Sequence, residues 1–265
     1  MVVPRTKKRV LGLQLAVAIA WLCVWEFAGR SSDNVFFLIG TPSAVLREFK
    51  QLLFFEDFHY HFLVTSGEAM IGLIIGTVVG AGVGLSLWYS ETAAATARPF
   101  IITLGTLPIF AFAPLMIVWF GIGFSMKVAL ATFSTVFVAF NQAYRGATLV
   151  SQEYVDVLRG MNASRHQVFA KVIIPGSLDW VLSSMRLNVG FALLGAFIGE
   201  FVASDKGLGY LILRAAGLYN IPRALAAAIG ITVLALFLDF VARYVESHRH
   251  VLVQILSVPR SIWRS

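Results

Sequence analysis

Histidine pairs are the first residues in this sequence whose types and spacing could support chemistry. His59 and His61 form one His-x-His pair, and His248 and His250 form another. A zinc site needs three or four side-chain ligands, so a lone pair supplies too few. The sequence also has no Walker A motif, no nucleophile elbow and no His-Glu-x-x-His motif. We therefore expect no catalytic residue, metal site or cofactor in this chain, and interpret the histidines as polar residues at the edges of apolar segments.

Charges inside apolar segments are the next candidates, because an ionised side chain there is costly and often functional. Arg186 has three open roles: it attracts an anionic solute, pairs with a carboxylate such as Asp239, or extends to the aqueous edge. Asp239 and Arg243 are four residues apart, which predicts an ion pair on one helix face. On the segment that holds Arg186, we expect Asn188 to form an interhelical hydrogen bond. Glu200, near the outer end, either contacts a partner protein or caps the loop that follows.

The composition is that of a membrane protein. Of the 265 residues, 58% are hydrophobic and 13% are charged, whereas soluble domains carry about 25% charged residues. The apolar runs are long and continuous, which predicts spanning helices and argues against the alternating pattern of a barrel. We interpret the net charge of +7 as basic loops that fix orientation, and not as a nucleic-acid site. The single cysteine, Cys23, cannot form an internal disulfide.

Six apolar segments predict an all-α protein with six membrane spans. They cover residues 10–28, 61–88, 97–120, 126–148, 178–202 and 224–245. We interpret the first as an uncleaved span, and residues 43–55 as an amphipathic helix on the membrane surface. Thirteen Lys and Arg residues fall on the side that holds the termini. Seven fall on the other side: Arg30, Arg47, Lys50, Lys127, Lys206, Arg214 and Arg223. This excess predicts that both termini are cytoplasmic.

Glycine and proline give two of the spans special features. In the second span, glycines recur every four residues, at Gly72, Gly76, Gly80 and Gly84. This glycine face predicts close approach of another helix, as either a static contact or a sliding surface. The third span contains Pro108 and Pro114, which predict either a packing kink or a broken helix beside a transport pathway.

Residues 151–175 form the longest charged stretch of the chain, and predict two short helices joined by a turn. Ser151 can cap the first helix, and Asn162 suits the left-handed residue at its end. Ser164 and Gln167 have the spacing of a capping box for the second helix. We expect Pro175 to end this unit, because proline lacks the backbone N–H that a helix needs. A polar element between membrane spans is typical of a docking site for a partner protein.

This stretch resembles the EAA loop of ABC importer permeases, whose pattern is E-A-A, three residues, G, nine residues and I-x-L-P. The residues that fall on the motif are Asp156, Val157, Leu158, Asn162, Val172, Ile174 and Pro175. The spacing matches, although Asp replaces Glu, Val-Leu replaces Ala-Ala and Asn replaces Gly. The resemblance implies that an ATPase subunit docks here. The implied coupling residues are Asp156, Val157, Leu158, Asn162, Ala163, Ser164 and Pro175.

Further motifs resemble the nitrate, sulfonate, taurine and bicarbonate branch of these permeases. They are Thr41-Pro42-Ser43-Ala44-Val45, Ala113-Pro114-Leu115, Trp119 to Gly123, and Gly207-Leu208-Gly209-Tyr210-Leu211-Ile212. The resemblance implies a multi-pass protein of the bacterial inner membrane that forms the path of a small solute by alternating access. It also implies two cytoplasmic ATPase subunits that hold ATP and magnesium, a periplasmic binding protein, and a second permease chain, most simply another copy. Candidate pathway residues are Pro108, Pro114, Arg186, Asn188 and Glu200.

Several alternatives stay open. An anion such as nitrate, a sulfonate, taurine or bicarbonate is our first expectation for the solute, and a pyrimidine-type vitamin precursor is the second. A secondary transporter that works without partners would leave the polar stretch unexplained, and a membrane enzyme would need clustered catalytic groups. We divide the chain into an N-terminal span with a periplasmic amphipathic segment (1–60), a permease core (61–249) and a cytoplasmic tail (250–265).

Overall fold

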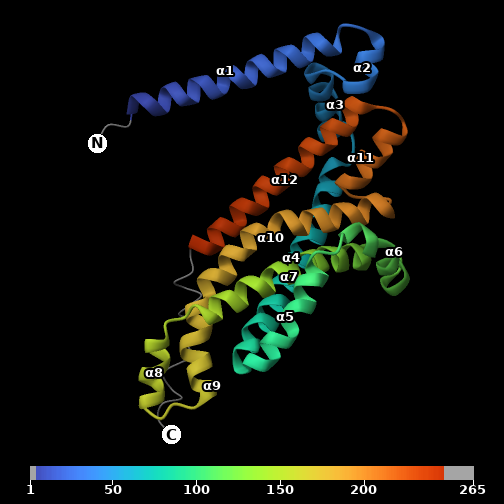
Figure 1. The fold of residues 1–265 in the computed structure, drawn as a ribbon. Coiled ribbons are helices and arrows are strands. Elements are labelled where there is room, and N and C mark those ends of the chain that lie inside the picture. The colour runs from blue at the N-terminus through green and yellow to red at the C-terminus, as the bar shows by residue number, and fades with distance from the viewer. Residues whose placement is uncertain (1–3, 248–265) are drawn as a thin grey trace. The chain divides into compact units, whose positions relative to one another are not determined.

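The computed structural model describes residues 4–247, and every regular element in that range is a helix (Figure 1). The chain divides into two compact units. The first comprises residues up to 62 together with 206–231, and the second comprises 63–205 together with the residues from 232 onward. The division at residues 60 and 249 that the sequence suggested stays a prediction. His248, His250 and the tail lie outside the described residues.

The first unit contains three N-terminal helices and one helix from late in the chain. These are α1 (Pro4–Gly29), α2 (Asp33–Ile39), α3 (Pro42–Phe55) and α11 (Leu208–Gly217), with the beginnings of α4 (Phe58–Ser86) and α12 (Ile221–Ser247). Thr41 caps α3 by accepting a hydrogen bond from the Ala44 amide at 3.2 Å. Glu26 of α1 accepts hydrogen bonds from the amide and hydroxyl of Ser43, at 3.0 and 2.7 Å, and so ties α1 to α3. The amphipathic helix predicted at residues 43–55 is therefore α3.

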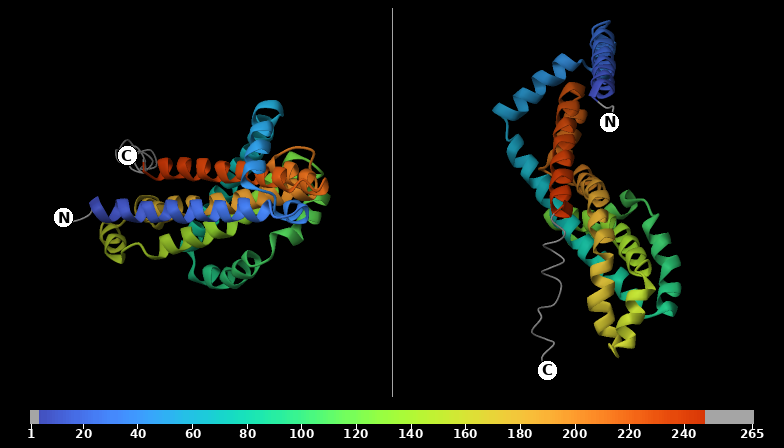
Figure 2. Two further views of the ribbon diagram at one scale, coloured as in Figure 1. Left: turned by 90° about the horizontal axis from the view of Figure 1, so that it is seen from above. Right: turned by 90° about the vertical axis from the view of Figure 1, so that its left-hand side faces the viewer.

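The second unit is a bundle built around α7 and α10, which pack along each other (Figures 1 and 2). Its elements are the rest of α4, the 3-10 turn η1 (Leu87–Tyr89), α5 (Glu91–Gly105), α6 (Ile109–Phe120), α7 (Phe124–Thr148), α8 (Gln152–Gly160), α9 (Arg165–Val168), the π-helical turn η2 (Phe169–Ile173), α10 (Ile174–Val202) and the rest of α12. Figure 1 shows α8 and α9 side by side at one end of the bundle.

Five helical stretches of the described chain are long and apolar enough to cross a membrane. The number rises to six if α5 and α6 count as one span. This agrees with the six predicted segments, and the third segment accounts for the difference. There α5 and α6 meet at an angle of 95°. Pro108 lies at the break as the N-terminal cap of α6, whereas Pro114 lies inside α6. The third segment is thus two helices, either a broken span or a re-entrant loop, since so sharp an angle exceeds a packing kink.

The glycine face of α4 lies directly against α7. A Cβ atom built on Gly76 would lie 1.8 Å from Thr135 Oγ1, and one on Gly80 would lie 2.2 Å from the carbonyl oxygen of Val136. Gly72 and Gly84 meet α7 in the same way, at 2.3 and 2.5 Å. The predicted close approach is therefore confirmed, because no larger residue fits at these positions without displacing α7.

The expectation that Pro175 ends the polar stretch is wrong. Residues 165–202 form one continuous helical stretch, in which α9, η2 and α10 follow without a break. Pro175 lies at the start of α10, in its first turn. Proline is tolerated there because first-turn N–H groups have no partner within their own helix. The sequence could not reveal this, since the intervening π-helical turn changes the hydrogen-bond register just before the proline.

Candidate coupling site and transport pathway

The polar element, defined here as residues 151–173, has two of its three predicted helix-end features. Asn162 has a φ of 58°, the left-handed conformation expected after the first helix. Ser164 and Gln167 form the capping box: the Ser164 amide donates to Gln167 Oε1 at 2.7 Å, and the Gln167 amide donates to Ser164 Oγ at 3.3 Å. Ser151 lies at the N-cap of α8, but its side chain makes no capping bond, so that detail was wrong.

The two faces of α8 differ in what they contact. On the inner face, Val155 is buried in a cluster with Ala147, Val168 and Ile173, against which Leu158 and Ala163 pack. On the outer face, three large side chains spaced at three and four residues are exposed: Tyr154 (65%), Val157 (62%) and Met161 (70%). Asp156 is exposed beside them. Of the predicted coupling residues, Leu158 and Ala163 therefore support the element, whereas Asp156 and Val157 point away from the bundle.

An aromatic cluster fastens the polar element to the end of α4. The rings of Tyr89 and Phe169 lie 4.6 Å apart, and those of Trp88 and Phe169 lie 5.7 Å apart. The Arg165 guanidinium lies over the Trp88 ring at 5.8 Å, close enough for a cation–π contact. The Tyr89 hydroxyl hydrogen-bonds to His166 Nδ1 at 3.2 Å. The element is therefore packed on η1, through contacts that no local sequence pattern indicates.

A buried ion pair joins α4 to α7. Lys127 Nζ donates to Glu68 Oε1 at 2.9 Å, and the two side chains are 1% and 0% exposed. On the same face of α4, Thr65 Oγ1 donates to Glu200 Oε1 of α10 at 2.6 Å, and both residues are fully buried. The expectation that Lys127 is one of the loop charges that set orientation is wrong, because its side chain is buried. A position at the first turn of a span does not distinguish a loop lysine from one that turns inward.

The sequence matches the model of a known protein family. Residues 72–251, more than half of the chain, match the family described as the binding-protein-dependent transport system inner membrane component. The chain belongs to this family. It is a multi-pass ABC importer permease of the bacterial inner membrane, in the branch that includes sulfonate and taurine permeases.

This permease is similar in sequence to several curated permeases, of which three are described here. A Haemophilus influenzae protein named as an ABC transporter permease is 30% identical over 236 residues, which cover 88% of this chain and 94% of the relative. The formylaminopyrimidine transport permease ThiX of Halalkalibacterium halodurans is 28% identical, covering 73% of this chain and 76% of its own. SsuC of Bacillus subtilis, named as an aliphatic sulfonates transport permease, is 27% identical, covering 89% and 84%.

The fold of the permease also matches a solved structure. The chain superimposes on the inward-facing MetNI methionine ABC transporter with a TM-score of 0.63 and 17% identity, over 71% of this chain and 94% of the other. At this identity the match supports the fold alone.

The candidate pathway residues of the permease are held mainly by contacts within the bundle. Arg186 lies 3.6 Å from Asp239 Oδ1 and 3.6 Å from Glu246 Oε2, so the carboxylate-pairing alternative describes its contacts. Asp239 also pairs with Arg243, as predicted. Asn188 Nδ2 donates to Thr77 Oγ1 at 3.4 Å, which confirms the interhelical bond. Roles of these residues along the path of a solute stay predictions.

Burial also limits what Glu200 can contact. Its side chain is 0% exposed, so this conformation leaves it no surface for a partner protein. Within residues 4–247, no three His, Cys, Asp or Glu side chains lie close enough together to hold a metal ion. His61, one of the paired histidines, accepts a hydrogen bond from the Gly207 amide at 2.9 Å.

Proposed function

We propose that this permease docks a cytoplasmic ATPase subunit through the polar element and transmits ATP-driven movement to the spans. Two ATPase subunits, a second copy of this chain and a periplasmic binding protein complete the importer. The chain then performs no chemistry of its own, because ATP and magnesium are held by the ATPase subunits.

One observation carries the docking proposal: the exposed outer face of α8. Tyr154, Val157 and Met161 present three large side chains on an otherwise polar element. An apolar stripe at this spacing is how an amphipathic helix enters a groove of a partner. The other face of α8 is packed on the bundle, and the aromatic cluster ties α9 and η2 to η1. Movement of the docked helix would therefore displace the end of α4.

For the solute we propose a small anion delivered by the binding protein. The aliphatic sulfonates permease SsuC is similar over a larger share of this chain than the formylaminopyrimidine permease ThiX. A vitamin precursor of the pyrimidine type is the second candidate, because ThiX is similar at nearly the same identity.

Recovery of the ATPase tests the docking proposal. The ATPase encoded beside this chain is co-expressed and pulled down by the tagged permease in detergent. Val157→Glu places a charge at the centre of the exposed face, and we expect the recovered ATPase to fall by about tenfold or more, the effect of about 1.4 kcal/mol.

Gln167→Glu is the matched control, since it puts the same side chain on an exposed position of the polar element outside α8, where glutamate also suits the capping box with Ser164. It should leave recovery unchanged. Equal recovery by both variants would move the main contact elsewhere. No recovery by the wild-type permease from its own ATPase would favour a transporter that works without partners.

A further inference from the structure

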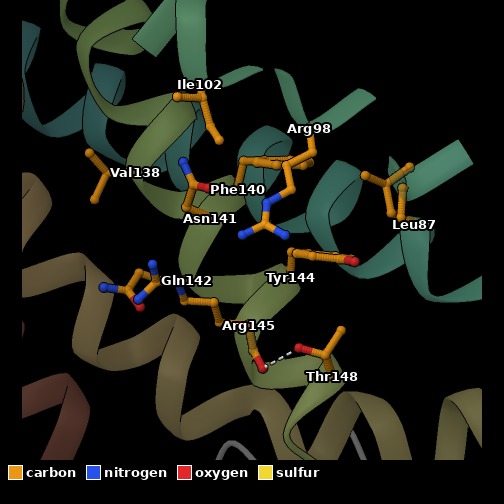
Figure 3. Close-up of a pocket in the computed structure, with 11 residues that line it drawn as sticks. Leu87, Arg98, Ile102, Val138, Phe140, Asn141, Gln142, Tyr144, Arg145 and Thr148 are labelled. Carbon is orange, nitrogen blue, oxygen red and sulfur yellow. Dashed lines mark hydrogen bonds between the residues drawn. The ribbon is translucent and has the colours of Figure 1, made fainter. Parts of the chain in front are cut away.

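A cavity of about 760 Å³ in the second unit lies between α5 and α7. Its polar lining includes Arg98 of α5 and Arg145, Gln142 and Tyr144 of α7. Figure 3 shows the Arg98 side chain extending from α5 toward α7. Both arginines are exposed, so the cavity is open to small molecules.

Neither arginine has an acidic partner in the part of the chain that the structure describes. Among residues 4–247, no ion pair includes Arg98 or Arg145, and none of the residues that line the cavity is acidic. Arg98 and Arg145 therefore present two unpaired positive charges to the same cavity.

A buried amide in the same cavity also lacks a partner. Gln142 Oε1 is inaccessible and accepts no hydrogen bond from the described chain. The oxygen and nitrogen of a glutamine amide exchange places by a half-turn, so this side chain can present N–H donors instead. Two guanidinium groups and the amide NH2 group can then donate hydrogen bonds to one oxyanion. The remaining wall is apolar, with Leu87, Ile102, Val138 and Phe140.

From this lining we propose that the cavity is a binding site for a small oxyanion with a short apolar tail, such as an alkanesulfonate. Arg98 and Arg145 hold the anionic head, and the apolar wall takes the tail. The inference rests on the proposed function, because the cavity would be a binding site along the transport pathway of the solute, near the polar element. Binding there should be weak, since a transported anion must also leave. A neutral aminopyrimidine can accept hydrogen bonds from the guanidinium groups but has no negative charge to pair with them.

Protection of a cysteine from alkylation tests the site with ethanesulfonate as the probe. The permease carries Cys23→Ser and Thr148→Cys, which places one thiol in the cavity lining. It is reconstituted in phosphatidylcholine nanodiscs and alkylated with the neutral reagent N-ethylmaleimide. At twice its Kd, ethanesulfonate should slow alkylation by about threefold, whereas matched chloride or 4-aminopyrimidine should not.

Substitutions of the arginines test whether protection from alkylation depends on Arg98 and Arg145. Arg98→Gln or Arg145→Gln should abolish it, Arg98→Lys should keep part of it, and Arg159→Gln, on α8 outside the cavity, should leave it intact. Protection that survives both glutamine variants overturns the proposal, as does equal protection by 4-aminopyrimidine or a Thr148→Cys thiol that does not react. Protection that appears when phosphatidylglycerol replaces phosphatidylcholine, without ethanesulfonate, assigns the arginines to a lipid headgroup and also overturns it.

Recovery of the ATPase is measured on the same preparations. Wild-type permease that recovers its ATPase but shows no ethanesulfonate protection contradicts the anion site alone. Protection without recovery of the ATPase supports the anion site and contradicts the docking proposal. The two outcomes are therefore distinguishable.

Discussion

At the scale of single residues, the buried pair of Lys127 and Glu68 should be sensitive to substitution. Both side chains are removed from solvent, and their ammonium and carboxylate groups meet at 2.9 Å. Removing one member of such a pair leaves the other charge buried. We therefore expect Lys127→Met to destabilise the permease by about 3–5 kcal/mol, measured as a lower unfolding midpoint in detergent.

The double variant Lys127→Met with Glu68→Gln separates a charge effect from lost packing. It removes both charges and should recover most of the lost stability, since no ion is then left buried. If the single and double variants unfold alike, the ion pair is not what the single change disrupts. Glutamine is used because it keeps the shape of the glutamate while removing its charge.

At the scale of helices, the packing of α4 on α7 depends on glycine. Gly76→Ala would place a methyl group 1.8 Å from Thr135 Oγ1, whereas the same change at Gly82 meets nothing within 4 Å. We expect Gly76→Ala to cost about 1–3 kcal/mol through overpacking, and Gly82→Ala to be neutral or stabilising because alanine favours helix. Comparing the unfolding midpoints of the two variants tests this. Equal midpoints would contradict a tight interface.

The helices of this permease also separate what a sequence can predict from what depends on tertiary packing. Hydropathy located every spanning segment, and the spacing of Ser164 and Gln167 identified a helix start, because both signals are local. The position of Pro175 inside a continuing helix and the angle at Pro108 depend on how neighbouring turns are packed. The cluster of Trp88, Tyr89 and Phe169 joins residues about eighty positions apart in the chain. No pattern within one segment specifies such a contact.

At the scale of the whole molecule, orientation depends on the charges that remain in the loops. Lys127 is buried and so leaves the outer group, which reduces that group from seven to six against thirteen on the other side. The burial therefore strengthens the prediction that the polar element and both termini are cytoplasmic. Arg98 and Arg145, counted on the cytoplasmic side, line the cavity that we propose for anions.

Two equally exposed residues can test this orientation. Met161 of the polar element and Leu218, between α11 and α12, are each 70% exposed. In a Cys23→Ser background without the ATPase, Leu218→Cys should react with a membrane-impermeant thiol reagent added to intact spheroplasts. Met161→Cys should react only after the membrane is opened, because six spans and the excess of basic residues put it inside. The reverse labelling pattern would show the opposite orientation, in which the polar element lies outside the cell membrane and cannot contact a cytoplasmic ATPase.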